Sequence, residues 1–229
     1  MRIRASLGVF IGITGVLVVG GALAKPPSSV NWVERGVVPS VRDQGMCGGD
    51  YAYVTASAVG SLLAIHGKGS AAISEQQLLD CSSAYGGHGC RGGELDSGFK
   101  YVIAKGATTR DAYPVTGTSE ECKIDGGAIR IKSYKDIPSG DCNALQAAVA
   151  HQPVMAVVDG MSLYPYSGGV FSSDDSNPKH DHAVLVVGYT PEYWLVQNSW
   201  GASWGEQGYI RLKRGNTAGI CDMASYPKL

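Results

Sequence analysis

The chain has 229 residues, a formal net charge of −1, 44% hydrophobic residues and 17% charged residues. This composition excludes an intrinsically disordered chain, whose signature is low hydrophobicity with high net charge, and the length fits one large domain or two small ones. The chain also lacks the surplus of basic residues typical of nucleic-acid-binding proteins, so we expect no nucleic-acid partner.

The first 24 residues differ from the rest of the chain. Arg2 and Arg4 precede an uncharged run over residues 5–24 that ends in Ala-Leu-Ala. A basic start, an apolar middle and a small-x-small end are typical of a cleaved secretory signal peptide. The run is also about 20 residues long, which is enough to span a bilayer, so residues 1–24 are either a signal peptide or an N-terminal membrane anchor. Both alternatives carry the remaining chain across a membrane, and we expect a secreted, lumenal (vacuolar or lysosome-like) or exoplasmically anchored protein.

Helical patterns dominate the first half of the chain. Apolar residues at helical spacing predict a helix over about residues 50–66. Ser74 and Gln77 form a capping-box pattern that opens a second helix. Residues 94–105 indicate a third helix, whereas residues 81–93 form a Gly-rich loop pinned by cysteines.

Strand patterns dominate the chain after about residue 134. A short helix over residues 143–150 is followed by β-branched or aromatic runs between turns, which predict strands. These runs cover residues 154–158, 183–189, 193–197 and 209–213. A helical part followed by a strand-rich part predicts an α+β fold with two lobes, a helical left lobe at 25–135 and a strand-rich right lobe at 136–229.

Six motifs carry the most specific signal in the chain. In one-letter code they are QGMCGGDYAY at 44–53, SEQQLLDC at 74–81, GCRGG at 89–93, DHAV at 181–184, NSWG at 198–201 and WGEQGY at 204–209. In this order they resemble the papain/cathepsin family of cysteine peptidases, and the resemblance covers residues 30–229. It implies a two-lobe papain-like fold with a helical left lobe, a β-barrel right lobe and a cleft between the lobes.

The resemblance also places the groups of the family's active site. His182 matches the histidine that shuttles the proton, Asn198 the residue that orients it, and Gln44 the side chain that stabilises the oxyanion together with the backbone N–H of residue 50. Trp200 matches the residue that shields the His–Asn pair. His182 and Asn198 follow position 50 by 132 and 148 residues, close to the spacing of about 130–150 residues in this family.

The nucleophile position carries Asp50 in place of the family's cysteine. A carboxylate is a poorer nucleophile toward an amide than a thiolate, and an ionised aspartate has no proton for His182 to remove. An aspartate at the start of a helix is nevertheless stable, because it binds free N–H groups and complements the helix dipole. We therefore expect a catalytically inactive homologue, a pseudopeptidase, that binds a peptide or a protein in the cleft as a monomer.

Two other functions stay open. The first is an active hydrolase of this family in which Asp50 and His182 activate water, without a covalent intermediate. The second is a structural or surface protein held by a membrane attachment through residues 5–24. His180, His182 and Asp50 would also form a metal-binding set if His180 turned toward the cleft, but we predict neither a metal ion nor a cofactor.

All six cysteines follow residue 24, and an even number of cysteines in an exported chain implies disulfides. The resemblance implies two pairs, Cys47–Cys90 and Cys81–Cys122. Cys142 and Cys221 remain, and they either pair by elimination or stay as two buried thiols.

The resemblance further maps a pocket that receives a substrate side chain. It is lined by Gly92, Gly93, Val157 and Ala183. Glu94 follows the two glycines, and its charge either faces this pocket or belongs to the solvated surface.

Overall fold

The computed structural model describes residues 26–69, 72–173 and 175–229. The expected signal peptide or membrane anchor at residues 1–24 lies outside these residues. Within the described part of the chain, no helix is both long and apolar enough to cross a membrane.

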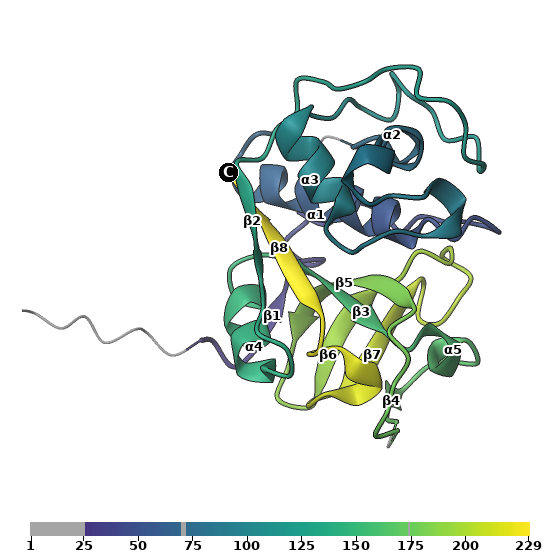
Figure 1. The fold of residues 1–229 in the computed structure, drawn as a ribbon. Coiled ribbons are helices and arrows are strands. Elements are labelled where there is room, and N and C mark those ends of the chain that lie inside the picture. The colour runs from purple at the N-terminus through teal and green to yellow at the C-terminus, as the bar shows by residue number, and fades with distance from the viewer. Residues whose placement is uncertain (1–25, 70–71, 174) are drawn as a thin grey trace, which may run out of the picture.

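The left lobe, drawn at the top of Figure 1, is built around the helix α1 (Asp50–Ile65). Every residue from Tyr51 to Leu63 is buried, as is typical of a helix that is apolar on all sides. It packs against α2 (Glu75–Cys81), α3 (Ser97–Ala104) and the sheet of the right lobe. The helix α1 therefore lies between the two lobes.

The capping box predicted at the start of α2 forms only in part. The Ser74 hydroxyl accepts a hydrogen bond from the Gln77 backbone N–H at 3.0 Å. The Gln77 side chain does not return to the Ser74 N–H, because that group already donates to the Thr108 carbonyl. It binds instead to the Thr108 N–H and to the carbonyls of Ile124 and Gly126, and so holds two distant loops against the helix.

Helix α3 begins three residues later than the sequence pattern predicts. The Glu94 carbonyl accepts hydrogen bonds from both the backbone N–H and the hydroxyl of Ser97. These bonds hold residues 94–96 in a turn, and the helix starts at Ser97. The Gly-rich loop before it contains two short 3₁₀ turns, η1 (Ser83–Tyr85) and η2 (Gly89–Arg91).

The right lobe consists of one sheet with strands β1 (Val30–Asn31), β2 (Ser133–Asp136), β3 (Val154–Val158), β4 (Val170–Phe171), β5 (His182–Tyr189), β6 (Tyr193–Gln197), β7 (Tyr209–Lys213) and β8 (Ala224–Lys228). The strand order is β2-β8-β3-β5-β6-β7-β4, with β1 paired to β5. Among the residues that the structure describes, this path is open, since β2 and β4 lie at its two ends and do not pair with each other. The strands thus form a sheet whose hydrogen bonds do not close the expected barrel.

Three short helices connect the strands: α4 (Cys142–Val149), α5 (Gly160–Leu163) and the 3₁₀ turn η3 (Thr217–Gly219). Asp141 caps α4 and Asp159 caps α5, each accepting a backbone N–H three residues on. Helix α5 follows β3 directly.

Two hydrophobic cores support the lobes. The first surrounds α1 and includes Phe99 and Tyr101, together with Leu185 from the sheet. The second lies within the right lobe and includes Trp194 and Ile210. The structure is an α+β fold of two lobes, as the sequence predicts, and the face of β5 toward α1 joins them.

The strand β2 spans the proposed lobe boundary between residues 135 and 136 and pairs with β8.

The six cysteines form three disulfides: Cys47–Cys90, Cys81–Cys122 and Cys142–Cys221. The alternative of two buried thiols in the right lobe therefore does not hold. The first bond ties the loop before α1 to the Gly-rich loop, where the Gly48 N–H also donates to the Cys90 carbonyl at 3.0 Å. The start of α1 is thus fixed covalently.

A buried carboxylate connects the chain before α1 to the left lobe. The Glu75 side chain is 4% exposed and lies between Arg42 at 3.5 Å and Arg110 at 3.2 Å. Burial raises the pKa of Glu75, and the two guanidinium groups lower it by less than burial raises it. The Arg42 carbonyl in turn accepts a hydrogen bond from the Gly201 N–H of the right lobe. Arg42 therefore connects Glu75 in the left lobe with Gly201 in the right lobe.

Replacing the Cys142–Cys221 disulfide with two alanines should lower the free energy of unfolding by about 2–5 kcal/mol, because the bond closes a long loop in the unfolded chain. Urea denaturation of both proteins measures this difference. Equal stability under oxidising conditions would contradict the contribution that we assign to the bond.

The variant Glu75→Gln should gain stability relative to the natural protein as the pH rises from about 4 to 7. The folded protein holds the Glu75 proton more tightly than the unfolded chain does, because burial raises the pKa of Glu75 in the folded state. The stability that this group contributes is therefore complete below its unfolded pKa and is lost as the pH rises through the folded one. Urea denaturation of both proteins across this range measures the difference, and a difference that stays constant or reverses would contradict it.

Candidate active site

Asp50 is the first residue of α1, and its side chain points toward the sheet. Its Oδ1 accepts the Tyr51 backbone N–H at 2.8 Å, and the side chain is 15% exposed. An acidic residue is favourable here because the helix dipole places partial positive charge at this end. The residue before it, Gly49, packs closely against Leu79: a Cβ atom at position 49 would lie only 2.2 Å from the Leu79 Cδ2.

His182 faces Asp50 from the first position of β5. Its Nδ1 lies 3.1 Å from the Asp50 Oδ2, and its Nε2 lies 2.7 Å from the Asn198 Oδ1. The Ala183 backbone N–H also donates to the Asp50 Oδ2, at 2.7 Å. The carboxylate therefore connects α1 in one lobe with β5 in the other.

The imidazole ring is held on three sides. The Asn198 Oδ1 also accepts the Ser199 N–H at 2.8 Å, which fixes the orientation of the amide. Trp200 stacks on the ring, with centroids 4.5 Å apart and an angle of 26° between the planes. Because both ring nitrogens of His182 face oxygen atoms, the imidazolium form supplies a donor to each. Asp50 and His182 thus have the geometry of an ion pair.

Gln44 adjoins Ser199, the residue after Asn198, and is oriented by two side-chain hydrogen bonds. Its Nε2 donates to the Cys47 carbonyl at 2.8 Å, and its Oε1 accepts the Ser199 hydroxyl at 2.5 Å. Sequence reasoning did not single out Ser199 as a functional residue. Its position between Asn198 and Trp200, inside a motif that carries two site residues, was the available signal.

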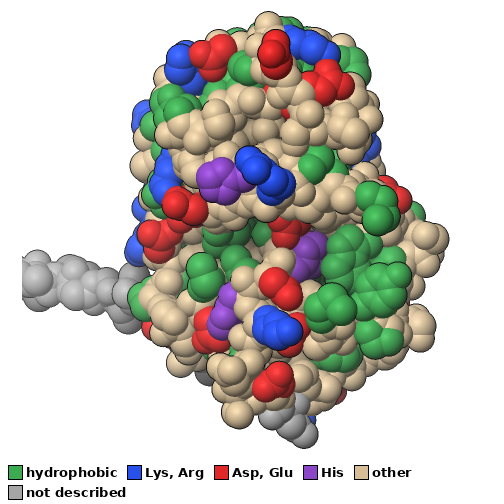
Figure 2. All heavy atoms as spheres, turned by 45° about the vertical axis from the view of Figure 1, so that its right-hand side comes forward, with side chains coloured by type: hydrophobic (Ala, Val, Ile, Leu, Met, Phe, Trp, Pro, Cys, Tyr) green, Lys and Arg blue, Asp and Glu red, His purple; other side chains and the backbone are tan. Residues whose placement is uncertain are grey.

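An open cleft of about 430 Å³ lies between the lobes, beside Asp50 and His182. Figure 2 shows this hollow, with histidine and acidic side chains along it. The four residues that the sequence assigned to a pocket line the cleft, and so does Glu94, whose position it left open: Gly92, Gly93, Val157, Ala183 and Glu94. The structure adds Leu95 and Met223, which no sequence pattern indicated, and Arg91, His180 and Asp181, which the sequence did not assign to the pocket.

Glu94 lies at the mouth of this cleft and is largely solvated. Its carboxylate binds the Lys100 ammonium group at 2.7 Å, and 65% of its side chain is exposed. The hydrogen bond from Lys100 lowers the pKa of Glu94. Its charge is therefore already paired at the surface of the left lobe.

His180 does not join Asp50 and His182. Its Nε2 lies 3.0 Å from the Asp222 Oδ2, so the ring is held away from Asp50. In the part of the chain that the structure describes, no three histidine, cysteine or acidic side chains are arranged to hold a metal ion. The interpretation of His180, His182 and Asp50 as a metal-binding set is wrong.

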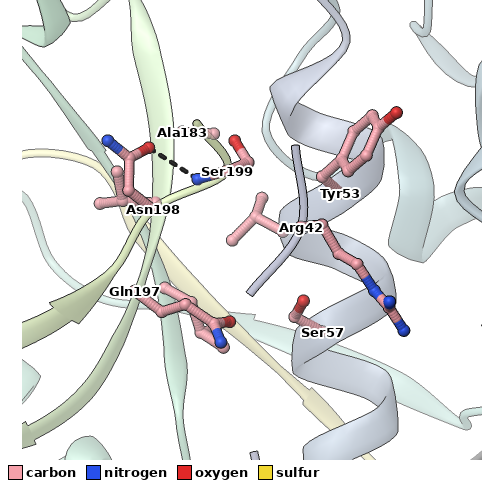
Figure 3. Close-up of a pocket in the computed structure, with 10 residues that line it drawn as sticks. Arg42, Tyr53, Ser57, Ala183, Gln197, Asn198 and Ser199 are labelled. Atoms are coloured by element: carbon pink, nitrogen blue, oxygen red, sulfur yellow. Dashed lines mark hydrogen bonds between the residues drawn. The ribbon is translucent and has the colours of Figure 1, made fainter. Parts of the chain in front are cut away.

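A second, much smaller cavity lies behind the site, between α1 and the sheet (Figure 3). Arg42, Tyr53 and Ser57 line it on one side, and Gln197, Asn198 and Ser199 line it on the other. Its free volume of about 10 Å³ is enough for about one water molecule. Among the described residues, the buried Asn198 Nδ2 has no hydrogen-bond partner. The seam between the lobes is therefore polar behind the site.

The contact between Asp50 and His182 should stabilise the folded protein. A double-mutant cycle with Asp50→Ala and His182→Ala should give a coupling energy of about 1–3 kcal/mol, because both side chains are largely buried. Urea denaturation of the four proteins measures it. The exposed pair Glu94–Lys100 is the control, with about 0–1 kcal/mol expected. A coupling no larger than that of the control would refute the interaction.

Comparisons with a family model and with curated proteins all find papain-type cysteine proteases. Residues 26–228 match the family described as Papain family cysteine protease. A cathepsin L-like proteinase of Phaedon cochleariae is 41% identical over 225 residues, which cover 93% of this chain and 68% of that protein. Vignain of Vigna mungo is 42% identical over 217 residues, covering 88% of this chain and 59% of that protein. The chain therefore spans roughly three fifths to two thirds of these curated relatives.

Solved structures show the same likeness. Digestive procathepsin L 3 of Tenebrio molitor superposes with a TM-score of 0.85 at 40% identity, covering 91% of this chain and 72% of that one. Bromelain of Ananas comosus in complex with the E64 inhibitor superposes with a TM-score of 0.82 at 34% identity, covering 89% and 99%. The order of the motifs, the two-lobe fold and these matches lead to one conclusion: the chain belongs to the papain family of cysteine proteases.

Proposed function

We propose that this protein is a catalytically inactive member of the papain family, a pseudopeptidase, that binds a peptide or protein segment in the cleft between its lobes. The observation that carries the proposal is Asp50, which stands at the position where the family's nucleophilic cysteine falls. His182, Asn198 and Gln44 are assigned by position to the proton-shuttling, orienting and oxyanion-binding roles of the family.

The hydrogen bonds of Asp50 support inactivity. Its two oxygens accept hydrogen bonds from Tyr51 and Ala183, and the His182 ring lies against the second oxygen. Attack by this carboxylate on a peptide would form a mixed anhydride, a high-energy acyl species. A general base must also reach the proton that it removes, and the His182 Nδ1, which faces the nucleophile position, already lies against the Asp50 carboxylate.

The cleft itself supports binding. The disulfide Cys47–Cys90 holds the loop before α1 against the Gly-rich loop, whose Gly92 and Gly93 line the cleft on the same lobe, and Val157 and Ala183 line it from the other lobe. A pocket formed in advance and lined by both apolar and polar groups is the usual form of a ligand site. Loss of the nucleophile removes the chemistry and leaves this surface in place.

An active hydrolase is the second candidate. Its support is that His182 is hydrogen-bonded to Asn198 and that Gln44 is hydrogen-bonded to the neighbouring Ser199. In that case Asp50 and His182 would activate water, and turnover would proceed without a covalent intermediate. An anchored structural role rests on residues 1–24, which lie outside the described part of the chain.

We place the protein in a secreted or lumenal compartment. Three disulfides support this location, because such bonds persist in oxidising compartments and are rare in reducing ones.

Residues 25–229 should not cleave fluorogenic peptides, whereas the variant Asp50→Cys should cleave them. The substitution supplies a thiol next to His182, which can then activate it. Turnover by the natural protein would contradict the proposal and favour the hydrolase. Inactivity of both proteins would mean that the cleft no longer supports chemistry of any kind and would favour the structural role.

Alkylation is the control for this assay. All six cysteines of the natural protein are paired, so iodoacetamide should add no mass to the native protein without reductant. Asp50→Cys should gain one adduct and lose its activity with it.

A further inference from the structure

The Asp50 carboxylate faces the cleft with part of its hydrogen-bonding capacity unused. An ionised carboxylate offers about four lone-pair positions to donors. Within residues 26–69, 72–173 and 175–229, three of them are taken: Oδ1 accepts the Tyr51 N–H, and Oδ2 accepts the Ala183 N–H and faces the His182 Nδ1. The side chain is 15% exposed and lines the cleft of about 430 Å³. The Oδ1 atom therefore keeps a lone pair in a group that a small molecule can reach.

A proton donor stands beside this carboxylate. The imidazolium form of His182 carries an N–H on Nδ1, which lies 3.1 Å from the Asp50 Oδ2. The bond between the His182 Nε2 and Asn198 and the stacking of Trp200 hold the ring in this orientation. His182 also lines the cleft. A nucleophile and an acid are thus fixed next to each other on one open surface.

The chemistry of a carboxylate decides which molecules this pair can attack. Attack on a peptide carbonyl leads to a mixed anhydride, which is less stable than the amide that it replaces. Attack on a saturated carbon of a strained epoxide ring leads instead to an alkyl ester, which is stable in neutral water, and the release of ring strain drives the reaction. The ring oxygen stays in the product and needs a proton, which a neighbouring acid supplies. An epoxide therefore matches both members of the pair.

We propose that the Asp50–His182 pair captures epoxides and that Asp50 is the site of this covalent modification. The Asp50 Oδ1 forms a bond to one ring carbon, and the bond between that carbon and the ring oxygen breaks. The ring oxygen takes the proton from the His182 Nδ1 and becomes a hydroxyl group. The products are a 2-hydroxyalkyl ester on Asp50 and a neutral imidazole. Each chain consumes one epoxide, so the reaction goes beyond the proposed function without making the protein a turnover enzyme.

The surroundings of Asp50 accommodate the ester. When Oδ1 is alkylated, Oδ2 becomes the carbonyl oxygen of the ester, and the Ala183 N–H remains its hydrogen-bond donor. The disulfide Cys47–Cys90 fixes the start of α1. The carboxylate and its donors therefore stand in place before the epoxide arrives, and little reorganisation accompanies the reaction.

The same contacts distinguish epoxides from ordinary alkylating agents. Two backbone N–H groups and the His182 ring draw electron density from the Asp50 carboxylate, which makes it a weak nucleophile. A reagent whose leaving group needs no proton gains nothing from His182, and iodoacetamide is such a reagent because iodide leaves as an anion. An epoxide gains the proton transfer, so it reacts where iodoacetamide does not.

The test treats residues 25–229 with 1,2-epoxy-3-phenoxypropane and follows the intact mass. One adduct per chain should form, and fragmentation of the tryptic peptide 43–68 after reduction should place it on Asp50. Mild alkali should release the adduct as a diol, because the bond is an ester and not an alkylated methionine or histidine. The ring-opened diol of the probe and iodoacetamide should add no mass.

Variants connect this labelling to the pair. Asp50→Asn should give no adduct, because the amide is a much poorer nucleophile than the carboxylate. His182→Gln should slow the labelling by about a hundredfold or more, which is the usual contribution of a general acid. Asp125→Asn is the matched control, because Asp125 is an exposed carboxylate that binds Lys105 and does not line the cleft. It should be labelled on Asp50 at the natural rate.

The outcomes decide the inference separately from the proposed function. Equal labelling rates in the natural protein and the His182→Gln variant would overturn it, because Asp50 would then react as any accessible acid does. An adduct on another residue, or none, would overturn it as well. Should a variant fail to fold, the natural protein in urea replaces it, and Asp50 labelling that persists there would contradict the inference. Peptide binding and peptide cleavage are measured independently, so the proposed function stands or falls on its own assay.

Discussion

The contact between the Asp50 carboxylate and the start of β5 is the interaction around which the site is arranged. It joins the first residue of α1, in one lobe, to His182 and the Ala183 N–H, in the other. Helix α1 is buried and its start is fixed by the disulfide at Cys47, while β5 is the strand that pairs with β1, β3 and β6. Two rigid elements therefore meet at a single side chain.

Under the proposed function, this arrangement holds the site in shape with an aspartate at the nucleophile position. The Asp50 carboxylate offers the His182 Nδ1 a hydrogen-bond acceptor, so the ring keeps a partner on each nitrogen. Trp200 covers the ring and Asn198 binds its Nε2. Nucleophilic reactivity toward peptides depends on a single side chain at position 50, whereas the geometry of the site depends on many contacts. One substitution can therefore remove this reactivity and leave the geometry in place. In the proposed function, the cleft serves as the binding surface.

Local patterns predicted much of this fold, and long-range contacts account for what they missed. The strands at 154–158 and 193–197 have the predicted bounds, because buried β-branched and aromatic runs between turns are strong signals. The motifs likewise indicated which residues meet in the cleft. The partner of His180 is Asp222, 42 residues away, and Met223 reaches the cleft through the pairing of distant strands. No local pattern encodes such contacts.

A crystal structure of residues 25–229 with a peptide bound in the cleft tests the central claim most directly. The account predicts an uncleaved peptide and an Asp50 carboxylate that still binds the His182 ring and the Ala183 N–H. A carboxylate turned away from β5, toward the peptide carbonyl or toward a water molecule in line with it, would contradict the account and indicate a working hydrolase.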